Sequence, residues 1–186
     1  MAAGAAVPGL FFTFAAMVLL IFASVSAPTW NSVSFLNVGR LHFGCFGFTG
    51  SQTSVGWFFP NALASQRLND DVFHSLTFVL VLIPVGAGLA GIAVLCGLCG
   101  AAYHRVGTVF MTLVSALAFL DVLVAWVIEM ALFGTARHDM RSRGINAQWG
   151  NANWLVLGAL VALFVGFFFS LCGSFGHYSR RRAAAY

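Results

Sequence analysis

Residues 76–102 read LTFVLVLIPVGAGLAGIAVLCGLCGAA and contain no charged side chain. A helix needs about 20 apolar residues to cross the ~30 Å hydrocarbon core of a bilayer. Water is absent at that depth, so the backbone amides must bond within the protein, and a helix achieves this inside one segment. The stretch therefore predicts a membrane-spanning helix.

Similar runs lie before and after this stretch, and only one of them carries acidic residues. The three are Val7–Ala27, Val106–Phe133 and Trp154–Phe175. Each is longer than the ~20 residues that a spanning helix requires. With 76–102 they predict one membrane domain, residues 1–186, that crosses the bilayer four times.

Composition supports a membrane protein and excludes several other classes. The chain is 60% hydrophobic and only 8% charged, with a mean hydropathy of +0.92, whereas about a quarter of the residues in soluble domains are charged. All nine cationic residues are Arg, and three of them are adjacent at 180–182. Because no basic stripe with interleaved aromatic residues is present, we exclude nucleic acid as a partner.

Four spans place both chain ends on one side of the membrane and both long loops, 28–73 and 134–153, on the other. The arginines at 180–182 directly follow the last span, and positive charge next to a span favours the cytoplasmic side. Most tryptophans lie near the loop-bearing face. We therefore predict that both termini are cytoplasmic, including the tail 177–186, and that both loops are extracellular.

The first loop has the composition of a small sheet. Trp30–Val38 and Leu41–Phe48 are rich in Val, Leu and Phe, and a turn with Gly39 separates them. This pattern predicts a β-hairpin, with Thr53–Phe59 as a possible third strand. The predicted fold class is an all-α membrane protein: a four-transmembrane-helix bundle with a small extracellular β-sheet from the first loop.

Short motifs follow one another in a recognisable order along most of the chain. They are SAP at 26–28, LHFGCFGF at 41–48, VGW at 55–57, PVGAGL at 84–89 and GNANWL at 150–155. In these motifs the chain resembles the claudin-like tetraspan proteins, and among them the fungal PalI family of pH-response regulators with its eisosomal relatives. The resemblance implies a claudin-like fold at the plasma membrane. The residues that we expect to shape the loop are Trp30, Gly44, Gly47 and Trp57.

One position departs from the family pattern. The family commonly has a cysteine just after the Gly-aromatic pair, where this chain has Thr49, and Cys45 is the only cysteine of the loop. A disulfide within the loop is therefore excluded, and packing must hold the loop sheet together.

Two acids interrupt the third apolar run. Asp121 lies near the midpoint of Val106–Phe133, where an acid costs about 2.5–3.5 kcal/mol on insertion scales. No span contains a cationic residue to pair with it. Three interpretations remain: a hydrogen bond inside the bundle, for example to Thr13, Thr77 or Ser115; a docking contact to a partner; or a proton- or cation-sensitive site. Glu129 lies about 80° round the helix and is expected to reach the headgroups.

Small residues four apart predict close helix packing in the second span. Gly86 and Ala90 form one such pair, and Ala87 and Gly91 form another; pairs of this kind let two helix backbones approach. We expect packing within the chain rather than a dimer contact. Pro84 should bend the helix near Leu80, because proline cannot donate a backbone hydrogen bond.

The remaining cysteines fall near the cytoplasmic ends of the spans. Cys96, Cys99 and Cys172 are candidates for palmitoylation, with apolar packing as the alternative interpretation. Their spacing to His104 and His177 fits no zinc site, and no catalytic or cofactor motif occurs in the chain. We predict no cofactor and no enzymatic activity.

The sequence thus favours a non-catalytic accessory or scaffold protein of the fungal plasma membrane. It would bind and stabilise a larger integral membrane protein, for which the resemblance implies an ambient-pH receptor complex. The alternatives are an eisosome-like membrane-domain organiser, an accessory subunit of a cell-wall polysaccharide synthase, and a small channel or transporter. Membrane lipids are expected partners, and a homo-oligomer is a further form of assembly.

Overall fold

The computed structural model describes residues 6–60, 71–102 and 105–183, and it is mostly helical. Four stretches of helix are long and apolar enough to cross a membrane. The chain is therefore a multi-pass membrane protein. The elements in chain order are α1 (Ala6–Ser24), β1 (Leu36–Val38), β2 (Leu41–Phe43), α2 (Asp71–Val79), α3 (Leu82–Ala102), α4 (Arg105–Ser142), β3 (Ala147–Trp149) and α5 (Ala152–Ala183).

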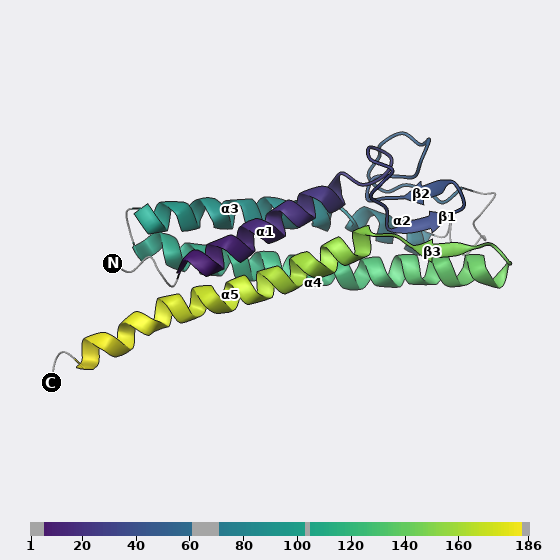
Figure 1. Ribbon diagram of the computed structural model, residues 1–186. Helices are drawn as coiled ribbons and strands as arrows, with labels where there is room; N and C mark the ends of the chain where they lie inside the picture. The colour runs from purple at the N-terminus through teal and green to yellow at the C-terminus, as the bar shows by residue number, and fades with distance from the viewer. Residues whose placement is uncertain (1–5, 61–70, 103–104, 184–186) are drawn as a thin grey trace.

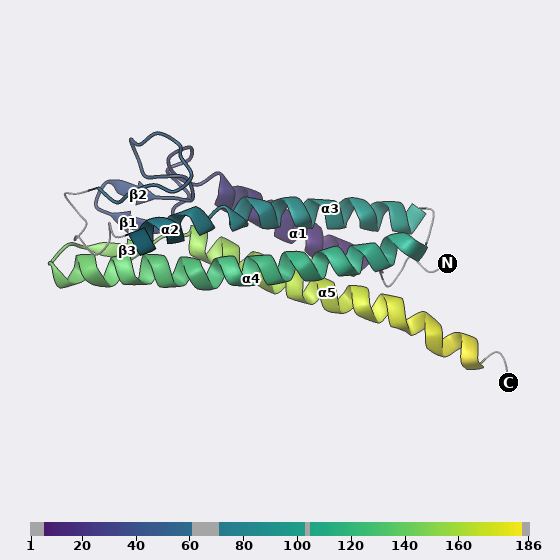
Figure 2. The same ribbon diagram turned by 180° about the vertical axis from the view of Figure 1, so that it is seen from behind.

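The long helices lie side by side, with the strands gathered at one end (Figure 1). α1 begins and α5 ends at the opposite end, which we call the terminus end; the other is the loop end. α3 packs on α4 and α1 packs on α5, while α1 also contacts α3. Figure 2 shows from behind how α2 and α3 follow one another along α4. This is the four-helix arrangement with a small sheet that the sequence predicts.

Residues without large side chains set the closest helix contacts. A Cβ atom on Gly166 of α5 would lie 3.0 Å from Oγ1 of Thr13 and 3.2 Å from the carbonyl oxygen of Gly9 in α1. A Cβ on Gly107 of α4 would lie 2.5 Å from Cα of Gly100 in α3. In lipid, where the hydrophobic effect does not drive helices together, such close backbone approach supplies the packing energy.

The second span is broken where Pro84 predicts a bend. α2 ends at Val79 and α3 begins at Leu82. Since Pro84 has no N–H, it cannot donate to the carbonyl group of Leu80. That oxygen instead accepts hydrogen bonds from the Ile83 amide at 3.1 Å and from the Cys45 thiol at 3.2 Å.

α4 is longer than the apolar run that predicts it. It continues to Ser142, so the segment from 134 to 142, expected to be loop, is helical. Ala136 and Met140 are fully buried, and with Leu132 they are spaced by four residues along one face. The apolar run ends at Phe133, but the helix beyond it is amphipathic and packs on the loops.

The sheet differs from the prediction in its third strand. β1 and β2 form the expected hairpin, shorter than predicted, with Gly39 in the turn at a φ of 60°. The third strand is β3, from the second loop, which pairs antiparallel with β1 so that the order is β2-β1-β3. The prediction of a strand at Thr53–Phe59 is wrong, because the free edge of β1 is occupied by a segment about 110 residues further along the chain.

Gly86 and Gly88 of α3 provide a matched test of the helix packing. A Cβ on Gly86 would lie 2.6 Å from Cγ2 of Val122 and 2.9 Å from Oδ2 of Asp121, whereas a Cβ on Gly88 meets nothing within 4 Å. We expect Gly86→Ala to destabilise the protein by about 1–3 kcal/mol through overpacking. Gly88→Ala should be neutral or stabilising, since alanine favours helix.

Thermal unfolding in mild detergent measures both effects. Equal midpoints for the two variants would contradict a close α3–α4 contact at Gly86.

Candidate functional site

The motif GNANWL at 150–155 fastens the second loop to the first. The Asn151 side chain donates to the carbonyl of Ser32 at 2.8 Å and accepts from the Ser34 amide at 3.0 Å. The Asn153 side chain donates to the carbonyl of Phe35 at 2.8 Å. Gly150 packs on the backbone of Ser34 so closely that a Cβ would overlap it. From the sequence these residues can be recognised only as a motif, because their role depends on contacts with residues almost 120 positions earlier in the chain.

The hairpin is fixed to the end of α1 through a second glycine. A Cβ on Gly44 would overlap the backbone of Ala27, so the predicted structural role of Gly44 has a steric basis. Gly47 adopts a φ of 147°, and a Cβ there would lie 2.5 Å from Oγ of Ser51. Thr49, which stands where the family commonly has cysteine, accepts from the His42 amide at 3.2 Å through its hydroxyl.

The two tryptophans expected to shape the loop lie in different surroundings. Trp57 is 4% exposed and packs on Phe43 and Phe59, with ring centroids 5.6 and 4.8 Å away. Trp30 is 45% exposed and lies against Phe22 of α1 at 5.8 Å. Only Trp57 belongs to the loop core.

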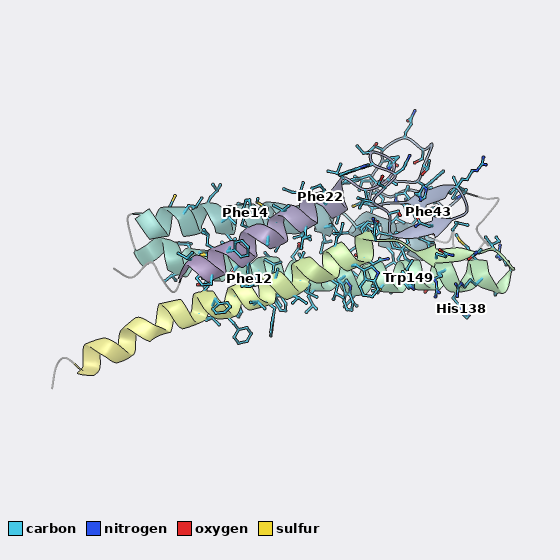
Figure 3. The ribbon with its side chains drawn as sticks, in the orientation of Figure 1. Phe12, Phe14, Phe22, Phe43, His138 and Trp149 are labelled. Carbon is cyan, nitrogen blue, oxygen red and sulfur yellow. The ribbon has the colours of Figure 1, made fainter. Side chains whose placement is uncertain are left out.

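Three arginines at the loop end of α4 lie against or near the second loop. Arg137 lies over the ring of Trp149 at 5.6 Å, Arg141 donates to the carbonyl of Ala147 at 3.1 Å, and Arg143 pairs with Asp139 at 3.4 Å. The two loops and the extension of α4 thus form one unit, which we call the loop domain. Figure 3 shows Phe43, Trp149 and His138 in this domain.

Cys45 lies where the loop domain meets the broken span. Its amide donates to Oγ of Ser26 at 2.9 Å, and its thiol donates to the freed carbonyl of Leu80. Burial, with a smaller contribution from the Glu129 carboxyl, raises the pKa of the thiol to about 12. A thiol that stays protonated is a poor nucleophile, so this free cysteine serves as a buried hydrogen-bond donor.

Glu129 is the most deeply buried acid among the described residues. Its side chain is 0% exposed, and neither carboxyl oxygen has a hydrogen-bond partner within the described part of the chain. The expectation that it reaches the headgroups is therefore wrong, because α4 continues past it to Ser142 and its side chain is fully buried. A buried carboxyl group without a partner is costly when charged.

Asp121 lies in a different environment. It is half-buried, and its Oδ2 atom, which has no partner among the described residues, lies beside Gly86. Leu117 and Val124, one helical turn away on either side, are both exposed, so Asp121 borders the face of α4 that would contact lipid. Its neighbour Gly86 also approaches Leu20, near the end of α1. Asp121 is thus in the loop half of the bundle rather than at its middle.

The hydroxyl groups offered by the sequence do not bond to Asp121. Thr13 donates to the carbonyl of Gly9, Thr77 to those of Trp57 and His74, and Ser115 to that of Thr112. The interpretation in which Asp121 hydrogen-bonds inside the bundle thus finds no donor among these three.

The remaining predicted residues lie in α3 and α5. Ala90 is fully buried, and a Cβ on Gly91 would meet Sδ of Met17 at 3.4 Å, an ordinary packing distance. Cys96 is half-buried and Cys99 is exposed at the terminus end, both as free thiols; the side chain of Cys172 is outside the described residues. Palmitoylation stays a prediction. Within the described part of the chain, no group of three or more His, Cys, Asp or Glu residues could hold a metal ion.

Comparison with protein families identifies the chain. The model of the SUR7/PalI family matches residues 5–169. The chain belongs to the SUR7/PalI family. A comparison with curated proteins finds no individual match. SUR7/PalI is not a known enzyme family.

The hydrogen bond from Cys45 to Leu80 can be tested with two substitutions. Cys45→Ser keeps a donor and should leave thermal stability in detergent nearly unchanged. Cys45→Ala removes the donor and should destabilise the protein by about 0.5–1.5 kcal/mol, the usual net contribution of one hydrogen bond, because the Leu80 carbonyl keeps the Ile83 amide as a partner. Cys99→Ala, at an exposed thiol, is the control. If Ser and Ala destabilise the protein equally, the hydrogen bond does not stabilise the junction.

Proposed function

We propose that this SUR7/PalI protein is a non-catalytic accessory protein of the plasma membrane, which binds and stabilises a larger integral membrane protein. Family membership supports a role in a membrane complex, and an ambient-pH receptor complex is the partner that we propose. The loop domain and the outer face of α4 are the surfaces available to such a partner.

The observation that carries this proposal is the position of Asp121. Asp121 is half-buried, and its Oδ2 atom lies inside the protein beside Gly86 without a hydrogen-bond partner among the described residues. An acid at membrane depth is costly unless it is paired. The exposed neighbours Leu117, Leu120 and Val124 form an apolar strip beside it. A partner helix that packs on this strip and presents a cationic or hydrogen-bond-donating group would pair with the part of the Asp121 carboxyl group that is not buried against Gly86.

Glu129, the other acid of α4, lies in a different environment from Asp121. Because its side chain is fully buried, a partner helix cannot reach it unless the protein rearranges. The two acids of α4 therefore have separate roles: Asp121 at a surface and Glu129 inside the protein.

The orientation of the chain is a first test. We expect both termini to be cytoplasmic and the loop domain to be extracellular, since the arginines at 180–182 follow the last span. Epitope tags at the C-terminus and in the first loop, stained in intact and in permeabilised cells, measure this directly. A C-terminal tag that stains intact cells contradicts the proposed orientation.

The partner contact is tested with substitutions of the two acids. Asp121→Asn and Asp121→Leu should each lower the recovery of the partner in mild detergent by about tenfold or more, the loss expected when one member of a desolvated polar pair is removed. The isolated variants should stay monodisperse, because the protein itself offers Oδ2 no partner among the described residues.

Glu129→Gln is the matched control, since it also removes one acid from α4 but at a fully buried position. It should leave partner recovery unchanged. Quantitative mass spectrometry of the purified complexes measures all three variants. Full recovery with both Asp121 variants overturns the contact, and a homogeneous homo-oligomer without a larger protein favours the membrane-organiser alternative.

A further inference from the structure

The described loops carry more positive than negative charge. Residues 28–60 contain Arg40 and no acid, whereas the second loop contains three arginines and a single acid, Asp139. Asp139 pairs with Arg143 at 3.4 Å. Within the described part of the chain, neither Arg40 nor Arg141 has an acidic partner. Two positive charges of the loop domain are therefore left without compensation by the described residues.

The sheet brings these two arginines to the same place. Arg40 lies in the turn of the β1–β2 hairpin, two residues after Val38, and Val38 pairs with Ala147 of β3. The carbonyl of Ala147 accepts from Nε of Arg141 at 3.1 Å. Both arginine side chains are exposed. Figure 1 shows the strands and the last turns of α4 together beyond the ends of α1 and α5. Two cations that are far apart in the chain thus lie at one end of the sheet.

The helix dipole explains one of these cations but not the other. A positive side chain near a helix C-terminus is stabilising by itself, and Arg141 lies one residue before the end of α4. Arg40 lies in a hairpin turn, where this effect does not act. The last carbonyls of α4 have backbone partners: Met140 accepts from the Ile145 amide and Arg141 from the Gly144 amide, each at 3.0 Å. The side chain of Arg141 is therefore not required for capping the helix.

The two arginines lie beyond the headgroups of the membrane that the protein crosses. Gly86 of α3 lies beside Val122 of α4, and the second span begins at His74, twelve residues before Gly86. Because α3 and α4 are antiparallel, this level on α4 is near Gly134. α4 rises by about 10 Å from there to Arg141, at 1.5 Å per residue. A headgroup layer adds only about 5–8 Å on each side of the hydrocarbon core, so a ligand reaches this end from water.

The spacing of the two arginines suits a short acidic peptide. β1 lies between β2 and β3, and neighbouring strands are about 4.8 Å apart, so the hairpin turn and β3 are within about 10 Å of one another. Alternate residues of an extended peptide point to one face and are about 7 Å apart. Two flexible arginine side chains can span that distance. A polysaccharide carries its charges along an extended chain, and the described loops have no long stripe of arginines to follow it.

We propose that this end of the loop domain binds an acidic segment of a protein outside the membrane. Two carboxylates at alternate positions of the segment pair with the guanidinium groups of Arg40 and Arg141. Guanidinium groups suit this role because they can donate two parallel hydrogen bonds to one carboxylate. Asp121 lies twenty residues earlier on α4, about 30 Å away along the helix. The contact is therefore separate from the one proposed at Asp121 and does not depend on it.

A fluorescent synthetic peptide tests the contact in the detergent-purified protein. The probe is a peptide of alternating Glu and Ser residues with both ends blocked, and the same peptide with Gln in place of Glu is the reference. Fluorescence anisotropy at low salt should show tighter binding of the Glu peptide, and added NaCl should remove the difference because salt screens exposed charges. Arg40→Gln should weaken binding of the Glu peptide about two- to fivefold, the contribution of one exposed ion pair. Arg40→Gln/Arg141→Gln should weaken it further.

The matched control is Arg105→Gln, which removes one arginine at the opposite end of α4 and should leave binding unchanged. Because the Arg40 side chain has no ion pair or hydrogen bond to the described residues, Arg40→Gln should keep the thermal stability of the protein. Equal binding of the two peptides, full binding by Arg40→Gln, or an equal loss for Arg105→Gln would each overturn the proposal. Tighter binding of dextran sulfate than of the Glu peptide, at equal concentrations of charge, would overturn it in favour of a polysaccharide.

Discussion

The constraint that organises this protein is the need to satisfy every backbone carbonyl at membrane depth. Pro84 removes one donor from the second span, and the carbonyl of Leu80 is left to find others. The Cys45 thiol is one of the donors to this carbonyl. The first loop is therefore attached to the second span at the point where Pro84 interrupts the helical hydrogen bonds. The same proline separates α2 from α3. α2 is then linked to the loop domain by the hydrogen bond from Thr77 to Trp57, while α3 packs on α4 and α1.

A second set of contacts makes one domain out of two loops. Asn151 and Asn153 bond to the backbone before β1, and β3 completes the sheet on the edge of that strand. Arg137 and Arg141 of α4 contact the second loop at Trp149 and at the carbonyl of Ala147. A disulfide is not needed for this assembly, because backbone and amide hydrogen bonds join the segments and the aromatic cluster around Trp57 fills the interior.

The two acids of α4 differ in how far each is buried. Glu129 is fully buried, whereas Asp121, two turns closer to the terminus end, is half-buried at the edge of an exposed apolar strip. Two residues of the same chemical type on one helix thus acquire different roles. At the terminus end, by contrast, α5 carries only positive charge beyond the bundle.

The sequence by itself determined the four spans, the break near Leu80, the hairpin and the family, because each follows from local composition, from proline chemistry or from short motifs. It also singled out Gly44 and Gly86, since small residues in such motifs indicate close contacts. Only the tertiary structure decided that the third strand is 147–149, that α4 continues to Ser142 and that Glu129 is buried. These features depend on contacts between segments far apart in the chain. A strand can pair with any sheet edge that is free, and an acid is buried or exposed according to the segments that cover it. Neither property follows from the residues next to it in the sequence.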